Sequence, residues 1–211
     1  MTLQNQDIVP MIRAFARVFR EQLGDIPWED PAYLDVQKAF ERIAGFSDKA
    51  PIHLSPCEKP VTRHWQRVTQ HASKGRLRPM AELLSELSPF LSWMDDPDYR
   101  GADVDAAFLE NYGCFELVGT KGIIYDQWTT LGCMLLSPEI YFPLHAHPQY
   151  ELLYILSGRG TWHMDKGQII SMPKETHILI PENRRHAFWS VGNLPMAAVY
   201  ICSKPLIHNE E

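Results

Sequence analysis

Three histidines and one glutamate have the types and spacing that could bind a metal. His145, His147 and Glu151 share parity, so on an extended strand their side chains point to one face. His186 opens a later run, which an antiparallel sheet can fold back across the first. Neutral imidazoles and one carboxylate that face an apolar interior are typical ligands of a first-row transition metal.

The alternative is that these residues are ordinary buried or surface side chains. For any one of the nine histidines alone, that interpretation would be preferred. Imidazoles and a carboxylate side by side in an apolar interior would each cost roughly 2 kcal/mol or more in desolvation unless they were paired. We therefore predict one divalent transition metal on these four residues, and the ligand set does not distinguish Fe, Mn, Zn and Ni.

The first half of the chain shows helical periodicity, from residue 6 to about 94. A first helix is expected to stop at Gly24, and a second to begin after Asp30. Third and fourth helices are expected over 61–73 and 79–93. The charged segment at 95–103 contains Pro and Gly and marks a boundary. We therefore expect a helical region at 1–95 and a linker at 96–111.

The second half, residues 112–207, is predicted to be a β-barrel. It contains short runs of β-branched and aromatic residues between turn residues, which predict about nine strands. The runs are 114–119, 123–136, 140–147, 150–156, 160–164, 168–172, 176–180, 186–191 and 196–202. The fold class is therefore mostly β with an α-helical N-terminal part, in an antiparallel sandwich or small barrel.

The composition of the chain excludes some classes of binding partner. The chain has 211 residues, a net charge of −6 and a pI near 5.8, which argues against a nucleic-acid surface or an anionic-membrane binder. No apolar stretch approaches the roughly 20 residues that span a bilayer, and the start lacks a secretory pattern. Four single cysteines favour reduced thiols. We expect a cytoplasmic protein that acts on a small molecule.

Two motifs resemble those of the cupin family. His145-x-His147-x-x-x-Glu151, followed by Gly158, is similar to the first cupin motif. The segment from Pro181 to His186 is similar to the second, with Asn183 in place of the usual glycine. The resemblance implies a cupin jelly-roll barrel, in which these three histidines and the glutamate hold the metal.

A narrower resemblance covers most of the chain. The segment 108–119, preceded by helices and followed by a cupin with His-Ala-His-Pro, resembles the cupin-type dimethylsulfoniopropionate (DMSP) lyases. This resemblance implies a carbon–sulfur lyase that splits DMSP into dimethyl sulfide and acrylate by β-elimination. The metal would bind the substrate carboxylate, a base would take the neighbouring proton, and the sulfide would leave.

Two positions depart from the family pattern. The family has a tyrosine two residues after the ligand glutamate, where this chain has Leu153. It also favours a tyrosine three residues before the first histidine, where this chain has Phe142. Each of these family tyrosines could act as a base or as a metal ligand. Tyr141 and Tyr154 are the replacement candidates, although Tyr154 has the wrong parity on its strand and would need a bulge.

Substrate contacts follow from the chemistry that the resemblance implies. A sulfonium cation favours aromatic walls, for which Trp128, Trp162 and Trp189 are candidates, and Arg185 could hold a carboxylate. Two other functions remain open: an oxygenase or isomerase on a small carboxylate, and a cupin that only binds a small molecule. The apolar helix faces must be buried on the barrel or on a second copy of the chain, in a homodimer.

Overall fold

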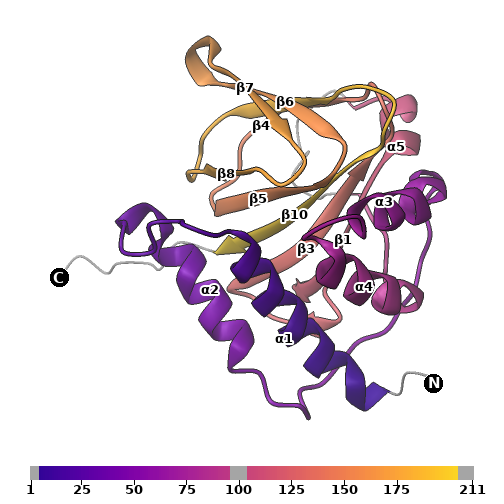
Figure 1. The fold of residues 1–211 in the computed structure, drawn as a ribbon, viewed down its shortest axis with the longest axis vertical. Coiled ribbons are helices and arrows are strands. Elements are labelled where there is room, and N and C mark those ends of the chain that lie inside the picture. Colours follow the sequence, from indigo (N-terminus) through magenta and orange to yellow (C-terminus); the bar gives the residue numbers. More distant parts are fainter. Residues whose placement is uncertain (1–4, 96–103, 204–211) are drawn as a thin grey trace.

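The computed structural model describes residues 5–95 and 104–203, which form a layer of helices and two β-sheets (Figure 1). The helices are α1 (Asn5–Gln22), α2 (Leu34–Ala44), α3 (Trp65–Ala72), α4 (Arg78–Leu87) and α5 (Ala106–Asn111). Short 3-10 turns are η1 (Pro31–Tyr33), η2 (Pro60–His64), η3 (Ser88–Phe90) and η5 (Asp165–Gly167). The predicted fold class, helices followed by a mostly β part, is confirmed.

Local sequence signals set the ends of the helices. Helix α1 ends just before Gly24, whose φ of +63° lies in the left-handed region that favours glycine. Asp30 caps the turn before α2 by accepting a hydrogen bond from the backbone N–H of Ala32 at 2.9 Å. The fourth helix is shorter than predicted and passes into η3 before Trp93. Pro89 has no N–H to donate there, and its ring disfavours a continued helix.

Part of the expected linker is helical. Residues 96–103 and 204–207, assigned to the linker and to the end of the barrel, lie outside the described residues. Asp105 caps α5 by accepting a hydrogen bond from the N–H of Phe108 at 2.7 Å. The buried ring of Phe108 stacks on Tyr112, with 5.2 Å between ring centroids. Helix α5 therefore packs directly against the start of the barrel.

The strands form a six-stranded and a four-stranded sheet. Their orders are β2-β1-β3-β10-β5-β8 and β4-β9-β6-β7. The strands are β1 (Tyr112–Gly119), β2 (Ile124–Tyr125), β3 (Thr129–Leu136), β4 (Tyr141–His145), β5 (Tyr150–Ser157), β6 (Arg159–Met164), β7 (Ile169–Pro173), β8 (His177–Ile180), β9 (His186–Ser190) and β10 (Met196–Ser203). The predicted runs match these strands closely, except that the run at 123–136 is divided by a turn around Asp126.

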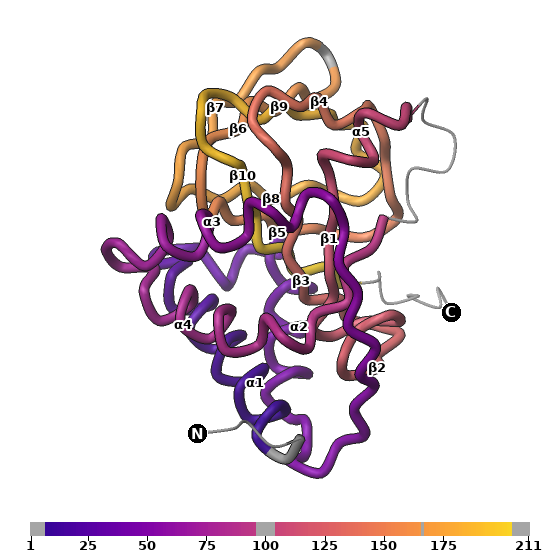
Figure 2. Tube along the Cα trace, turned by 90° about the vertical axis from the view of Figure 1, so that its right-hand side faces the viewer, coloured from indigo at the N-terminus to yellow at the C-terminus, as the bar shows by residue number. Residues whose placement is uncertain are grey.

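The six-stranded sheet is covered on both faces. Helices α1 to α4 lie against its outer face, and the four-stranded sheet lies across its inner face (Figures 1 and 2). Alternate residues of each strand therefore enter different cores. On β5, Leu152 and Tyr154 pack with the helices, while Leu153 and Ile155 pack with the small sheet.

The apolar helix faces are buried within this one chain. Ile8, Phe15 and Phe19 of α1 are fully buried in the cluster that includes the outer face of the large sheet. The ring of Phe19 lies 5.9 Å from that of Tyr154 on β5. Across the part of the chain that the structure describes, no helix combines the length and apolar character needed to cross a bilayer.

One ion pair, between a half-exposed arginine and a buried aspartate, joins the helical layer to the large sheet. Asp126, only 5% exposed, accepts a 2.6 Å hydrogen bond from Arg42 Nε on α2. Its other oxygen accepts hydrogen bonds from the backbone N–H groups of Trp128 and Thr129, both at 2.8 Å. We expect Asp126→Ala to lower the free energy of unfolding by about 2 to 3 kcal/mol, because it leaves these donors without their acceptor. Urea unfolding of the metal-free protein measures this change.

The matched control is Asp48→Ala. Asp48 pairs with Arg13 on α1, but its side chain is 64% exposed. An exposed pair contributes little, so the expected change is below about 1 kcal/mol. If the two substitutions lowered the free energy of unfolding equally, that result would contradict a structural role for the Arg42–Asp126 pair.

Candidate metal centre

The four predicted ligands come from three strands and one turn. His145 ends β4 and lies directly opposite His186, the first residue of β9, in the antiparallel pairing of these strands. His147 lies in the turn between β4 and β5, and Glu151 is the second residue of β5. The residues therefore meet through a turn, whereas the sequence analysis placed 145, 147 and 151 on one extended strand.

The three imidazoles form a compact cluster. One ring nitrogen from each of His145, His147 and His186 lies within 4.8 Å of the others. The ring centroids of His145 and His186 are 4.1 Å apart, and those of His147 and His186 are 5.2 Å apart. Among the described residues this is the group whose geometry could hold a metal ion.

Backbone carbonyls orient each ring. The Nδ1 atoms of His145, His147 and His186 lie 2.9, 3.1 and 2.9 Å from the carbonyl oxygens of Pro143, Gln149 and Arg184 respectively. Because a carbonyl oxygen only accepts, each Nδ1 is assigned the proton and donates it. Each Nε2 therefore keeps its lone pair, which is the form that binds a metal, and the hydrogen bond fixes the ring.

Glu151 adds a carboxylate to the cluster. Its Oε2 atom lies 3.2 Å from Nε2 of His147, and both residues are buried. With Nδ1 of His147 donating to Gln149, the facing Nε2 and Oε2 atoms both carry lone pairs. Such a pair is stable only with a proton or another cation between the two atoms. The three imidazoles therefore form the group that could hold a divalent ion, and Glu151 adjoins it through His147.

Burial and neighbouring charge shift the pKa values of this site. Burial lowers the pKa of His186 to about 4, and the positive charge that His145 can carry adds to the effect. Burial alone would raise the pKa of Glu151, but the close contact with His147 and the positive charge that the three nearby imidazoles can carry hold this pKa below its usual value. At neutral pH the site thus contains a neutral His186 and a charged carboxylate, as metal binding requires.

A cavity of about 180 Å³ opens onto the cluster. Phe142 and Phe188 of the small sheet form one apolar wall, and each is 1% exposed. Its other wall comes from the inner face of the large sheet and its loops, with side chains that include Glu116, Trp128, Thr130, Met134, Tyr200 and Cys202. Cys202 Sγ lies 3.9 Å from Oε1 of Glu151. The cavity can admit a small molecule to the histidine cluster.

The structure places the candidate tyrosines away from this cavity. Tyr141 is 43% exposed and packs against Trp189, with 5.4 Å between ring centroids. The hydroxyl of Tyr154 points to the helical layer, where it lies 3.3 Å from Nη2 of Arg76. Burial raises the pKa of Tyr154, and Arg76 partly offsets this. Neither phenol lines the cavity.

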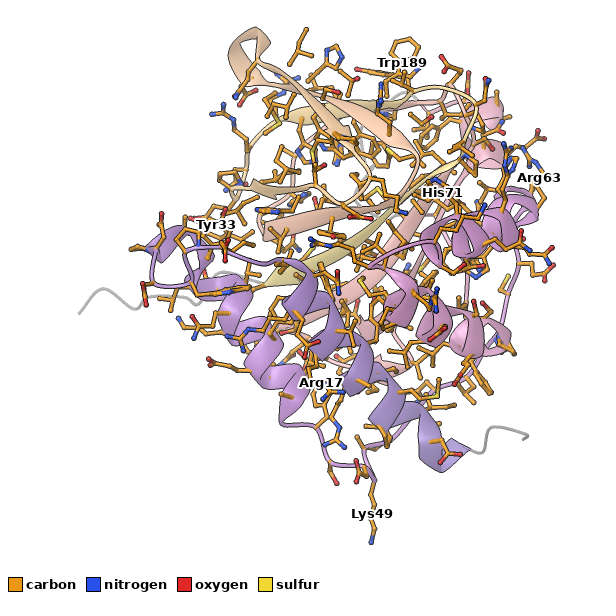
Figure 3. The ribbon with its side chains drawn as sticks, in the orientation of Figure 1. Arg17, Tyr33, Lys49, Arg63, His71 and Trp189 are labelled. Atoms are coloured by element: carbon orange, nitrogen blue, oxygen red, sulfur yellow. The ribbon has the colours of Figure 1, made fainter. Side chains whose placement is uncertain are left out.

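Of the four candidate substrate residues, one lines the cavity and three lie elsewhere. Trp128 lines the cavity. Trp162 is fully buried and stacks on Phe188, with 4.6 Å between ring centroids, so it supports the wall from behind. Trp189 projects from the small sheet at the outside of the molecule (Figure 3), and Arg185 is exposed in the turn before β9.

Several cavity residues were not anticipated from the sequence, among them Glu116 and Tyr200. Glu116 on β1 and Tyr200 on β10 belong to predicted strands, but parity alone does not say which face of a strand points inward. The inward face follows from strand pairing, which aligns Tyr200 with Leu153 of β5 and with Gly132 of β3. Leu153, where the family pattern has a tyrosine, is fully buried.

The fold and the site together define a cupin with a candidate metal centre. A sequence profile described as dimethylsulfoniopropionate lyase matches residues 39–198. The chain therefore belongs to the DMSP lyase family. This confirms both the cupin fold and the family that the motifs resemble.

Individual relatives agree with this assignment. The chain is 31% identical over 107 residues to the putative dimethylsulfoniopropionate lyase DddL of Cereibacter sphaeroides, covering 51% of this chain and 44% of DddL. It is 25% identical over 89 residues to the dimethylsulfoniopropionate lyase DddQ of Ruegeria pomeroyi, covering 42% of this chain and 44% of DddQ. The matches thus span less than half the length of each of these relatives.

Solved structures show the same fold. A chain from the crystal structures of the DMSP lyases RdDddP and RnDddQII superposes with a TM-score of 0.70 at 20% identity, covering 98% of this chain and 97% of that chain. DddQ from Ruegeria pomeroyi superposes with a TM-score of 0.61 at 17% identity, covering 84% and 94% respectively. The similarity of fold includes the helical layer as well as the barrel.

The ligand assignment predicts the metal content of variants. We expect His147→Ala and Glu151→Ala each to lose stoichiometric metal, because each substitution removes one of the converging donor atoms. Elemental analysis of purified, metal-loaded protein measures this loss. The control is His163→Ala, which removes an exposed histidine of β6 and should keep the metal. Full retention in both cluster variants would refute the site.

The pKa of His186 predicts how the stability of the metal-free protein depends on pH. This pKa of about 4 lies below the unfolded value of 6.5, so the unfolded state takes up a proton first as the pH falls. The contribution of His186 to the free energy of unfolding is present above about pH 6.5 and declines as the pH falls toward 4. The His186 contribution to this loss is about 2 kcal/mol between pH 7.5 and 5.

Urea unfolding at several pH values measures this dependence. The variant His186→Gln should show a shallower decline between pH 7.5 and 5, whatever its stability at pH 7.5. An equally steep decline in the variant would show that another group causes the loss.

Proposed function

We propose that the protein is a metal-dependent carbon–sulfur lyase that converts DMSP into dimethyl sulfide and acrylate. The observation that carries this proposal is the cluster of three imidazoles, with the carboxylate of Glu151 beside His147, on the wall of a cavity of substrate size. Membership of the DMSP lyase family supplies the substrate and the reaction.

A divalent ion on these residues would supply Lewis-acid chemistry, which polarises the substrate carboxylate and acidifies the adjacent C–H bond. The C–H electron pair then forms the C=C bond of acrylate, and the C–S electron pair leaves with neutral dimethyl sulfide. One proton remains to be accepted. Besides the candidate metal ligands, Tyr200 is a described residue of the cavity wall whose phenol oxygen could take it.

The protein's own contribution is to position the imidazoles and to keep water away from one side of the site. Backbone carbonyls hold the three imidazoles in their metal-binding orientation. Phe142 and Phe188, with rings stacked at 4.4 Å, form a rigid apolar wall beside His145. A charged carboxylate and a proton in transit interact more strongly in such a site than in bulk water.

The activity test is headspace detection of dimethyl sulfide. Purified protein is loaded separately with Fe(II), Mn(II), Zn(II) or Ni(II) and given DMSP. We expect turnover with at least one metal and none after chelation. The variant Leu153→Tyr should raise kcat by about tenfold or more, since a positioned general base contributes about 10²- to 10⁴-fold.

Leu153→Phe is the matched control, because it adds the same ring to this buried position without the hydroxyl. It should not raise kcat. Absence of dimethyl sulfide from both the native protein and Leu153→Tyr, with every metal, would refute the proposal. Activity in Leu153→Tyr alone would favour the second candidate, a relative that uses this metal centre on another small carboxylate. Oxygen uptake and isomerase assays would then follow.

A further inference from the structure

Glu116 lies at the far side of the cavity from the histidine cluster. In the large sheet β5 and β1 are separated by β10 and β3, and neighbouring strands lie about 4.8 Å apart. Glu151 is on β5, and Glu116 is on β1. Both line the same cavity. The cavity therefore has a metal-binding side and a second side that carries a carboxylate.

The ring of Tyr200 lies between these two sides. The ring of Tyr200 crosses β3 at Gly132, where an added Cβ would come within 2.5 Å of the tyrosine hydroxyl. That hydroxyl donates a 3.2 Å hydrogen bond to the carbonyl oxygen of Phe115 on β1. The ring thus reaches from β10 toward Glu116. Trp128, 41% exposed, lines the cavity as well.

The Glu116 carboxylate is held in place by its own loop. Its Oε2 atom accepts a 2.9 Å hydrogen bond from the backbone N–H of Lys121. This contact ties the side chain to the turn after β1, and the residue is partly exposed at the cavity wall. A carboxylate beside aromatic rings is the chemistry that recognises a permanent cation, which has no hydrogen to donate.

We propose that Glu116, with the rings of Tyr200 and Trp128, forms a subsite for the onium group of the substrate. This inference rests on the proposed function, which places the substrate carboxylate at the metal side. The cavity then selects small zwitterions that carry a carboxylate at one end and a permanent cation at the other. Carboxylates of the same shape that carry an uncharged thioether or alkyl group in place of the cation bind less tightly.

The test is a binding measurement that needs no turnover. Metal-loaded protein is titrated by calorimetry with 3-(trimethylammonio)propanoate and with 4,4-dimethylpentanoate. The two ligands share one shape, and the second replaces the charged nitrogen with carbon. Neither has a sulfide leaving group. We expect the native protein to prefer the cation by between about threefold and tenfold.

Variants assign this preference to Glu116. Glu116→Gln removes the charge, and its amide oxygen can still accept the hydrogen bond from Lys121. The preference should decrease through weaker binding of 3-(trimethylammonio)propanoate, with unchanged affinity for 4,4-dimethylpentanoate, and the rings account for the preference that remains. Glu116→Asp keeps the charge and should keep part of the preference. The control Glu86→Gln, at an exposed position of α4, should behave as the native protein does.

Two results would overturn the subsite: equal affinities in the native protein, or an undiminished preference in a folded, metal-loaded Glu116→Gln. Failure of the proposed function gives a different pattern. A protein that releases no dimethyl sulfide but prefers the cation through Glu116 has the subsite without the lyase activity. A protein that releases dimethyl sulfide without the preference has the activity without the subsite.

Discussion

The structure depends on one electrostatic constraint, which is that several lone pairs converge on one point inside an apolar interior. Three backbone carbonyls take the Nδ1 protons of the histidines, so the Nε2 lone pairs face inward beside the carboxylate of Glu151. Without a cation the facing lone pairs repel one another, and their removal from water costs free energy. Two sheets must hold them together, because His145 and His186 belong to the small sheet while Glu151 belongs to the large one.

The helical layer makes this arrangement practicable. It covers the outer face of the large sheet, so β5 and β10 are buried on both sides. The inner face can then carry polar groups such as Glu151 and Tyr200 while the outer face supplies apolar burial. The ion pair between Arg42 and the buried Asp126 joins α2 to the loop that carries Trp128, a residue of the cavity wall. The helices thus bear on the cavity although no helical residue lines it among those described.

Sequence patterns predicted the parts that depend on local chemistry. Strand runs, the stop at Gly24, the cap at Asp30 and the metal-ligand motif are all encoded within a few residues. The cavity wall is different, because Tyr200 and Glu116 face inward only through the pairing of β10, β3 and β1. Tyr141 has the parity of His145, but the register of the β4–β9 pair shifts between Phe142 and His145, and its ring lies outside. Such irregularities leave no periodic signal in a single chain.

Gly132 is enclosed by the neighbouring strand as well as by Tyr200, which has an evolutionary consequence. An added Cβ at position 132 would come within 2.2 Å of the carbonyl oxygen of Phe115 and within 2.5 Å of the Tyr200 hydroxyl. Because the closer contact is with backbone, a smaller residue at position 200 would not make room for a side chain at position 132. Homologues that keep this pairing of β1 and β3 are therefore expected to keep glycine at position 132, whichever residue stands at position 200.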